Sequence, residues 1–549
     1  MAGLVLYSLL VALVLPFVCR AQTPEQLKLM SQGHLQVAGC AERPCAVLRT
    51  PVDKDWDKVK FVLGFIAQGQ GPADSHQLAS LHTRLLTLSG NLRTDKVLQQ
   101  HGLLEYLKKK PGTFFTEDLP FLASIVLHLE DLFPDGLQYV TPELPQAHLR
   151  KIQVLALVAA AFLGVVPHNQ RRLLAHHPKK FQMNQNKLDM FYRGFMEREA
   201  KFRSLLIYFA SMRARLANCW NEMMKAGIFS KALCVTPCQC ATLEDGTLIA
   251  PTDELLGIYR QTDMAANFSS ATGSVKVTSP AVSVGDIANS QKPLLAFEVL
   301  DVGDISTSDG DLQVDFADQY LGGLSMFKGD IAQEEFLFIT YPELLPVMLL
   351  SDIMRANEAV VMKGAERFVF SDGYEWTFRI TAAAGPWTKL PPTKHYGVQG
   401  VVPMDRLGRR DVTVVGIDAV QFFVRAAQYT KEMIDRELLK AVIGFKGDPF
   451  EEVMALSHQA VATGLWGCGV FNGDAQLKSL LQWMAASYSG RATKFYTFAN
   501  KSVKDLARVI PQLRSKYSTV SNLYNAIKEV VASRPRELSS AWSLWGNLL

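Results

Sequence analysis

The feature of this sequence that most restricts its fold is a change of pattern along the chain. Residues 52–232 carry apolar side chains at helical spacing, and no clear strand pattern interrupts them. After residue 292, short strand-like runs alternate with helical ones. Alternation of this kind favours an α/β domain around a mostly buried sheet, in which ligands bind where strand ends meet helix N-termini. We therefore predict an all-α region followed by an α/β domain.

Three segments support the helical prediction. Thr116 can cap a helix that ends near Phe133-Pro134. The run from Ile152 to Val166 is apolar on all sides, which predicts a buried helix that is too short to span a membrane. Residues 200–224 form a long amphipathic pattern.

The second half is predicted from its short apolar runs. Residues 265–291 are rich in Ser, Thr, Ala and Gly and are predicted to be a loop or linker. The predicted strands are Leu312–Phe316, Ala359–Met362, Thr377–Ile380, Val412–Ile417 and Lys494–Phe498, and the predicted helices are Glu335–Arg355, Tyr429–Val442 and Ala475–Ala486. The expected domains are a signal peptide (1–21), a helical accessory domain (22–232), a Cys-containing connector and loop (233–291) and an α/β domain (292–549).

The N-terminal sequence predicts export. Leu4–Val18 is an almost unbroken apolar run, followed by Cys19-Arg20-Ala21 with small residues at −3 and −1 of a break after Ala21. This is the pattern of a cleaved signal peptide, and the run is short for a bilayer span of about 20 residues. We expect a secreted or secretory-lumen protein with no stable membrane span after cleavage.

The cysteines are consistent with an oxidising compartment. Cys468 lies in an apolar, glycine-rich motif and is predicted to be a small buried residue. The other six after the signal could form three disulfides, although zinc binding by the 234–240 cluster is the alternative. These six are Cys40, Cys45, Cys219, Cys234, Cys238 and Cys240. The acceptor sequences for N-glycosylation begin at Asn267 and Asn500.

Charge and composition narrow the range of partners. The net charge of +4 on 549 residues is too small to indicate a nucleic-acid interface, so no binding to duplex DNA or RNA is expected. With 48% hydrophobic and 20% charged residues, the chain has the composition of a globular protein.

Two motifs carry the chemistry. In the first, a strand runs from Gln313 into the glycine turn Gly322-Gly323, and Gln333-Glu334-Glu335 follows at a predicted helix start. Glycosidic cleavage needs a proton donor for the leaving oxygen and a base for water, and one carboxyl can serve as both in turn. The simpler interpretation is an acidic first turn that complements the helix dipole.

The second motif is the glycine-rich stretch from Thr463 to Asp474, which precedes another predicted helix. Glycines allow backbone N–H groups to approach an anion, and a helix N-terminus adds positive potential. The spacing is that of neither a dinucleotide-binding fingerprint nor a P-loop, so no NAD or ATP site is indicated. The alternative is a tight turn between a strand and a helix.

Together these segments resemble the poly(ADP-ribose) glycohydrolase family, a specialised macrodomain. The resemblance covers about residues 95 to 530. It implies a three-layer α/β/α mixed sheet preceded by an all-α accessory domain. The residues that carry it are Val314-Asp315-Phe316-Ala317, Gly322-Gly323, Gln333-Glu334-Glu335, Val415-Gly416-Ile417-Asp418-Ala419, Ala462-Thr463-Gly464, Trp466-Gly467-Cys468-Gly469 and Gly473-Asp474.

The resemblance also implies roles for individual residues. Glu335 would be the general acid/base for cleavage of the ribose–ribose bond of poly(ADP-ribose), and Glu334 would bind ribose hydroxyls beside it. Phe378 falls where the family carries an adenine-stacking Tyr. Neither a metal nor a cofactor is required. Further contacts to substrate would come from Gly322, Gly323 and Gln333, and the diphosphate would be held by Gly467, Cys468, Gly469, Val470 and Phe471.

Four departures from the family pattern lie around the presumed ligand. Leu324 replaces the third glycine of the turn, and its side chain would obstruct the site if that position needs positive φ or close approach to ribose. Asp318 replaces a ribose-contacting Asn, which puts a third carboxyl beside Glu334 and Glu335 in the predicted catalytic set. Ser306 stands where an adenine-contacting Glu is expected, and Leu465 replaces a polar residue. These changes keep two alternatives open, namely an inactive relative that binds ADP-ribose and a structural extracellular protein that keeps only the fold.

Overall fold

The computed structural model describes most of the chain from residue 54 onward. The described ranges are 45–46, 54–89, 101–133, 137–165, 198–226, 241–249, 254–384, 404–451, 460–534 and 542–549, apart from positions 139, 143, 243–247, 272, 309, 327–328 and 352. The proposed signal peptide, the six cysteines expected in disulfides or zinc and the sequence around them lie outside these ranges or have undescribed side chains.

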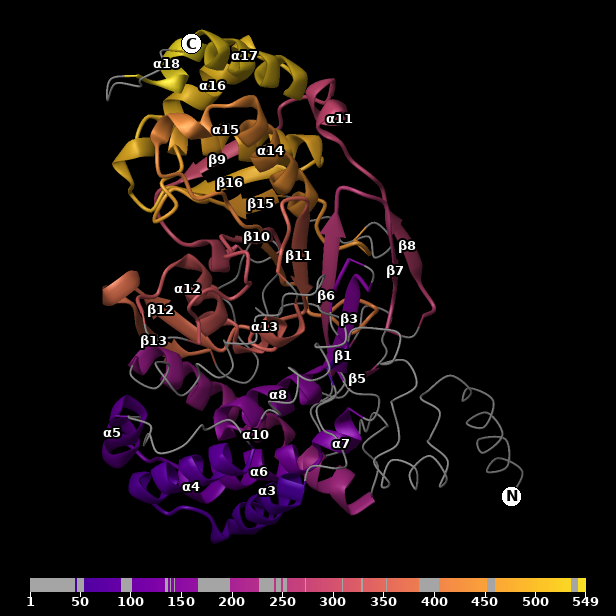
Figure 1. The fold of residues 1–549 in the computed structure, drawn as a ribbon, viewed down its shortest axis with the longest axis vertical. Helices are drawn as coiled ribbons and strands as arrows, with labels where there is room; N and C mark the ends of the chain where they lie inside the picture. Colours follow the sequence, from indigo (N-terminus) through magenta and orange to yellow (C-terminus); the bar gives the residue numbers. More distant parts are fainter. Residues whose placement is uncertain are drawn as a thin grey trace, which may run out of the picture.

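The N-terminal part is a helical domain that forms the lower end of the molecule in Figure 1. Its largest elements are the predicted buried helix, observed as α8 (Lys151–Leu163), and the predicted amphipathic helix, observed as α10 (Glu199–Ala226). Within α8 only Gln153 is not buried. The remaining helices are α3 (Lys54–Phe65), α4 (Ser75–Leu88), α5 (His101–Lys109), α6 (Leu119–Leu127) and α7 (Leu129–Leu132).

The second part is built on an eight-stranded mixed sheet. Its strand order is β3-β6-β11-β14-β10-β15-β16-β9, with parallel pairing from β14 to β9 and antiparallel pairing from β3 to β14. The strands are β3 (Gln146–Arg150), β6 (Leu255–Thr262), β9 (Phe297–Leu300), β10 (Leu312–Asp315), β11 (Glu358–Lys363), β14 (Thr413–Gly416), β15 (Ala460–Thr463) and β16 (Ala492–Tyr496).

Helices cover both faces of this sheet, which confirms the predicted three-layer arrangement (Figure 1). Successive side chains of a strand point to opposite faces, so Val360 and Met362 of β11 face one core while Ala359 and Val361 face the other. The first core contains α12 (Gln333–Thr340), α13 (Val347–Leu350) and the helical domain. The second contains α14 (Lys431–Phe445), α15 (Ala475–Tyr488), α16 (Leu506–Lys516), α17 (Val520–Ser533) and α18 (Leu544–Leu548).

Most predicted elements are present, with shifts that have local causes. The predicted helix Glu335–Arg355 is broken, because Pro342 and Pro346 cannot continue the hydrogen-bonding of α12. Thr116 does not cap a helix, since it lies inside the π-helical turn Phe114–Asp118 that precedes α6. The predicted strand Thr377–Ile380 is observed as β13 (Arg379–Ala383), which pairs only with β12 (Val369–Asp372) in a separate hairpin.

Two predictions about the middle of the chain were wrong. Residues 265–291 are not a linker, because β7 (Ala266–Ser269) and β8 (Lys276–Ser279) form a hairpin and α11 (Val284–Ala288) follows. The buried Phe268, whose ring is 5.9 Å from that of Tyr259, holds this hairpin against the sheet. A domain boundary at residue 292 also excludes β3 and β6, both of which belong to the sheet.

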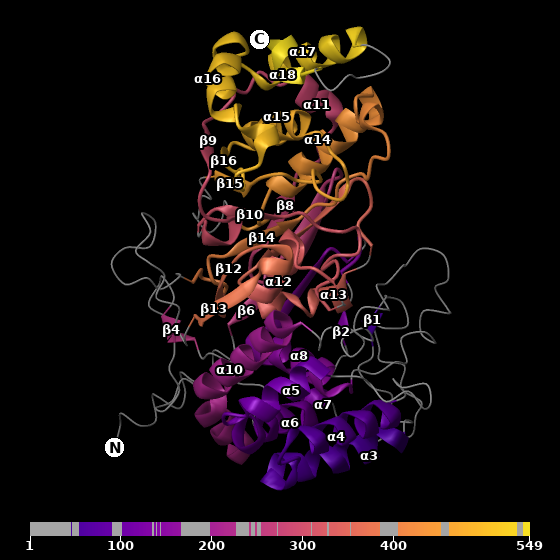
Figure 2. The ribbon, with the colours of Figure 1, turned by 90° about the vertical axis from the view of Figure 1, so that its left-hand side faces the viewer.

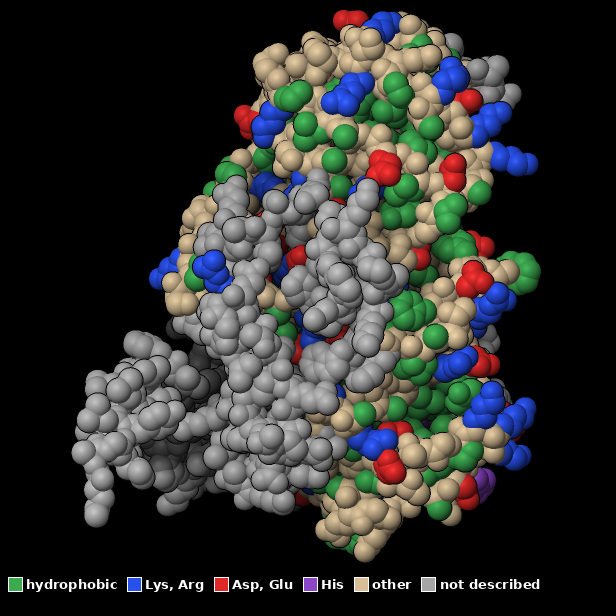
Figure 3. All heavy atoms as spheres, turned by 180° about the vertical axis from the view of Figure 1, so that it is seen from behind, with side chains coloured by type: hydrophobic (Ala, Val, Ile, Leu, Met, Phe, Trp, Pro, Cys, Tyr) green, Lys and Arg blue, Asp and Glu red, His purple; other side chains and the backbone are tan. Residues whose placement is uncertain are grey.

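A buried cluster of charges joins the helical domain to the sheet domain. Arg215 of α10 donates two hydrogen bonds to Glu366, at 2.8 and 2.9 Å, and Arg410 contributes a third contact to Glu366 at 3.3 Å. Lys151 of α8 pairs with Glu343 in the same interface. Charged side chains on the outer surface are of both signs and interspersed, as the described part of the face in Figure 3 shows. Within the described residues, no helix is long and apolar enough to cross a membrane.

The Arg215–Glu366 pair makes a testable contribution to stability. Burial would raise the pKa of Glu366, but the charges of Arg215 and Arg410 lower it to about 2. Because this folded-state pKa lies below the unfolded value, the stabilisation is present above about pH 4.5 and is lost as the pH falls toward 2. We expect Arg215→Met to lower the free energy of unfolding by about 3 kcal/mol at neutral pH and to reduce its loss in acid.

Urea unfolding at neutral pH and in acid measures both effects. Arg379→Met is the matched control, because Arg379 pairs with Asp372 at 72% and 62% side-chain exposure. Such a surface pair contributes about 0–1 kcal/mol. An Arg215→Met protein as stable as this control would contradict the assignment.

Candidate active site

The site lies where three adjacent strands of the sheet end. β14, β10 and β15 are parallel neighbours, so their C-terminal ends meet at one edge. The glycine turn follows β10 and the glycine-rich loop follows β15, and their closeness is shown by Gly464, where an added Cβ would lie 3.5 Å from the Phe316 ring. Figure 2 shows α12, which begins at this edge, facing the viewer near the middle of the molecule. A crevice outside the carboxyl ends of strands is where α/β sheets bind ligands.

Two carboxylates stand side by side at the N-terminus of α12. Glu334 and Glu335 are each only 5% exposed. The Glu334 carboxylate accepts hydrogen bonds from the N–H groups of Asp318, at 3.0 Å, and Gly322, at 2.5 Å. The Glu335 carboxylate accepts from the N–H groups of Leu324, at 2.7 Å, and Ala332, at 3.0 Å. Each of the four oxygens therefore has a backbone donor, and the helix dipole adds to the positive potential.

The glycine turn passes directly over these carboxylates. Gly323 has φ +45°, and a Cβ at this position would lie 2.3 Å from Oε2 of Glu334 and 2.6 Å from Oε1 of Glu335. Gly322 has φ +93°, and its added Cβ would lie 2.5 Å from Cγ of Met348. A side chain at either position would therefore collide with these atoms, and both φ values lie in the left-handed region that favours glycine.

Leu324 does not have the conformation that the glycine pattern suggested. Positive φ in this turn is confined to Gly322 and Gly323. The Leu324 side chain is 48% exposed and lies against Gly329, where an added Cβ would be 3.3 Å from its Cδ1. Its N–H is used to hold Glu335. Leu324 therefore does not need the positive φ that a glycine would allow, and its side chain is exposed at the edge of the turn.

Gln333 joins the strand end to the helix start. Its Oε1 accepts a hydrogen bond from the N–H of Phe316 at 2.8 Å, and its Nε2 donates to the carbonyl of Val314 at 2.9 Å. The Gln333 side chain thus bonds to the backbone at the end of β10, after the last residue that pairs with β15, which is Gln313. These two hydrogen bonds fix the start of α12, and with it the two carboxylates, relative to the sheet. Both polar groups of the Gln333 side chain are used in them.

The glycine-rich loop offers unpaired donors. The N–H groups of Gly467, Gly469, Val470 and Phe471 have no hydrogen-bond partner among the residues that the structure describes. Two bonds within the loop hold its shape, from Gly473 N–H to the Gly467 carbonyl at 2.8 Å and from Asn472 N–H to the Gly469 carbonyl at 2.9 Å. A row of N–H groups without partners, placed before a helix, can bind an anion.

A buried lysine lies beneath this loop. The Nζ of Lys478, on α15, is 3.8 Å from the centre of the Trp466 ring and pairs with Glu437. An added Cβ at Gly467 would lie 3.2 Å from the same Nζ. Burial, together with the charge of Arg436, lowers the pKa of Lys478 well below its usual value. The lysine supports the loop from the inside.

The other predicted site residues have mixed placements. Phe378 is 8% exposed and packs edge-on against Phe336 at 5.5 Å, so it presents no open ring to the site. Asp318 turns its carboxylate back to the N–H of Tyr320 at 2.8 Å, and only its backbone contacts Glu334. Cys468 is partly buried and unpaired. Ser306 is fully buried and donates to Asp304.

Two aromatic residues at the edge of the site escaped the sequence analysis. Tyr374 lies at the tip of the β12–β13 hairpin, and 46% of its surface is exposed. Partial burial, together with the negative charges of Glu375 and Glu335, raises the pKa of the Tyr374 hydroxyl to about 12. Phe498 is exposed after β16, with φ +50°, and lies 3.3 Å from an added Cβ at Gly464. A non-glycine residue with positive φ is a signal of function that only coordinates can show.

The comparisons with known proteins agree with this geometry. Residues 106–230 match the helical-domain model of the poly(ADP-ribose) glycohydrolases, and residues 284–505 match the model of their macro domain fold. A probable poly(ADP-ribose) glycohydrolase 2 of Arabidopsis thaliana is 34% identical over 282 residues, which are 45% of this chain and 51% of the relative.

Two relatives from Caenorhabditis elegans are similar over shorter stretches. Poly(ADP-ribose) glycohydrolase 2 is 36% identical over 34% of this chain and 37% of the relative, and poly(ADP-ribose) glycohydrolase 1 is 34% identical over 39% and 27%. The matched region spans about half or less of the length of these curated relatives.

Gly323→Ala tests the close approach of the turn to the carboxylates. The new methyl group would collide with carboxylate oxygens and adopt an unfavourable φ, so we expect a loss of about 1–3 kcal/mol in the free energy of unfolding. Gly64→Ala, in the last turn of α3 just before the π-helical turn Ile66–Gln70 and with open space around it, should instead stabilise the protein by about 1 kcal/mol. Thermal unfolding of both variants is the measurement, and an unchanged Gly323→Ala protein would disprove the contact.

Proposed function

We propose that this chain, which belongs to the poly(ADP-ribose) glycohydrolase family, hydrolyses the ribose–ribose O-glycosidic bonds of poly(ADP-ribose) and releases ADP-ribose. The observation that carries the proposal is the pair of buried carboxylates, which lies beside a loop with unpaired N–H groups. This arrangement offers proton transfer and anion binding at one strand edge.

Glu335 is the proposed general acid/base. In its protonated form it donates a proton to the departing ribose oxygen while the bond from that oxygen to the anomeric carbon breaks. The resulting carboxylate then removes a proton from the water that attacks the anomeric carbon, which restores the acid. Its hydrogen bond to Leu324 N–H fixes the carboxyl group in one orientation.

Glu334 and the glycine turn are proposed to hold the ribose. Glu334 is fixed on both oxygens by backbone donors, and a carboxylate oxygen can accept more than one hydrogen bond, so the same group is proposed to accept from ribose hydroxyls as well. Its negative charge also stabilises positive charge that develops at the anomeric carbon. Gln333 keeps this pair in register with β10.

The glycine-rich loop is proposed to hold the diphosphate. Four N–H groups that have no hydrogen-bond partner among the described residues are proposed to donate to it without a metal ion. The N-terminus of the following helix α15 is already capped by the Asp474 carboxylate. Phe498 and Tyr374, both exposed at the edge of the site, are proposed to provide aromatic faces for the adenine. Phe378, which we had expected in this role, is 8% exposed.

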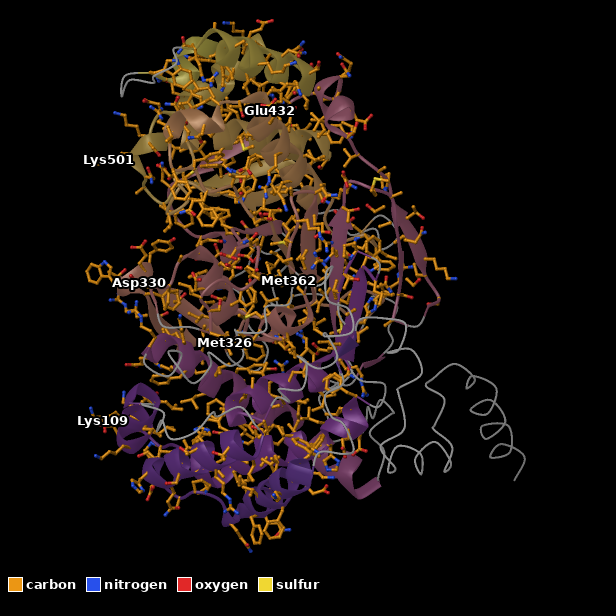
Figure 4. The ribbon with its side chains drawn as sticks, viewed as in Figure 1. Lys109, Met326, Asp330, Met362, Glu432 and Lys501 are labelled. Carbon is orange, nitrogen blue, oxygen red and sulfur yellow. The ribbon has the colours of Figure 1, made fainter. Side chains whose placement is uncertain are left out.

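The assay for this function is release of ADP-ribose from purified polymer. Glu335→Gln should lower kcat by about 10²–10⁴-fold, because the general acid/base is lost while the shape of the side chain is kept. Glu432→Gln is the matched control, on the exposed surface of α14 far from the site (Figure 4). Background-level release by the wild-type protein, equal to that of Glu335→Gln, would refute the proposal.

The compartment is a separate proposal. We propose that the chain enters the secretory pathway, on the strength of the apolar run at residues 4–18 and the small residues before Gln22. Both glycosylation sequences are accessible, since Asn267 is exposed on β7 and Asn500 is exposed before a short 3₁₀ turn. Asn500 lies two residues after Phe498, at the edge of the site.

Expression in cells with a secretory pathway tests this compartment. We expect a secreted chain that begins at Gln22 and gains mobility on a gel after removal of N-linked glycans. Asn267→Gln and Asn500→Gln identify the occupied position. A chain that keeps Met1 and remains in the cytosol would contradict the proposal.

A further inference from the structure

The first turns of α10 (Glu199–Ala226) and the residue before it, Arg198, donate hydrogen bonds to backbone carbonyls around the candidate site. Ser204 Oγ donates to the carbonyl of Ile339, at the end of α12, at 2.6 Å. Arg198 Nε donates to the carbonyl of Gly329 at 3.1 Å, and its guanidinium also pairs with Asp330. Figure 4 shows the loop that carries Met326 and Asp330 adjoining the start of this helix. The helical domain therefore contacts both the loop before α12 and the end of α12.

Lys201 makes the contact nearest to the carboxylates. Its side chain is 1% exposed, and its Nζ donates to the carbonyl of Leu324 at 2.9 Å. The N–H of Leu324 in turn donates to Oε1 of Glu335 at 2.7 Å. The backbone of Leu324 is thus held from both ends, by a cation of the helical domain and by a carboxylate of the sheet domain.

A buried ammonium group at this position needs a specific reason. Moving an ion out of water costs several kcal/mol unless partners compensate for the lost hydration. A methionine or leucine would fill the same space without that cost. The gain from a lysine here is a charge-assisted hydrogen bond to a carbonyl that neighbours Glu335.

We propose that Lys201 is a positioning residue of the active site, which fixes Leu324 and through it the orientation of Glu335. The helical domain then completes the catalytic site of the sheet domain, because the sheet domain alone cannot supply this donor. The effect on turnover rests on the proposed function, whereas the effect on the Leu324 backbone does not.

The charges around Lys201 predict how the contact depends on pH. Burial lowers the pKa of Lys201 to about 8, Glu335 and Asp330 oppose this shift, and Arg198 adds to it. The ammonium group is therefore lost as the pH rises through about 8. Above that pH the hydrogen bond to Leu324 loses its charge, so kcat should decline on the alkaline side.

The test compares three variants of the full chain in steady-state hydrolysis of polymer. Lys201→Met should lower kcat by about tenfold or more, leave KM within about twofold and abolish the alkaline decline. Lys201→Arg should keep most of the rate and shift the decline to higher pH, because a guanidinium stays protonated. Arg203→Met, also on α10, should behave as wild type, since Arg203 contacts the carbonyl of Ile380 at 3.4 Å and pairs with Glu199 at 3.7 Å, away from Leu324.

Hydrogen–deuterium exchange gives a readout that does not depend on activity. The amide of Leu324 should exchange about tenfold or more faster in Lys201→Met than in the wild type, at equal thermal stability. Wild-type exchange, kcat and pH profile in Lys201→Met would overturn the positioning role. Absence of polymer hydrolysis by the wild type would instead refute the proposed function, and the exchange result would then decide the role of Lys201 alone.

Discussion

The structure around the site depends on the need to hold two adjacent carboxylates in a buried position. Like charges on neighbouring residues repel, and each loses hydration on burial. Four backbone N–H groups compensate, one for each oxygen of Glu334 and Glu335. Three of these donors come from the turn after β10 and the fourth from the residue before α12. The turn can reach them only because Gly323 has no side chain.

This arrangement explains why distant parts of the chain are needed for one site. The sheet fixes the position of β10, and Gln333 fixes the start of α12 relative to β10 by hydrogen bonds to Val314 and Phe316. The loop between Leu324 and Ala332 is then fixed from outside by α10. Catalytic side chains need neighbours that hold them in place, and those neighbours need support in turn. Here part of that support comes from Arg198 and Lys201 of the helical domain, across the domain interface.

The sequence predicted the strands and helices next to the site better than the edge of the sheet and the residues that support the site. Strong local patterns gave β10, β14, α14 and α15, and the glycine turn and carboxylate pair located the strand edge. The short strand β3 was missed because its polar residues lack alternation and its pairing with β6 is set by distant contacts. Phe378 was predicted from the family resemblance, but it is buried in a small core, whereas Tyr374 of the same hairpin is exposed. The contact between Lys201 and Leu324 could not be predicted from the sequence, because the two residues are 123 positions apart.

Leu324 shows why a departure from a motif must be judged by backbone geometry. A third glycine in the turn suggested a need for positive φ, and a leucine there suggested an inactive protein. The need applies to Gly322 and Gly323, while Leu324 has an ordinary φ and contributes only its N–H and carbonyl. Any residue except proline supplies these two groups, since proline alone lacks the N–H. The leucine therefore leaves the backbone contacts to the carboxylates intact, and the sequence difference carries no argument from backbone conformation against catalysis.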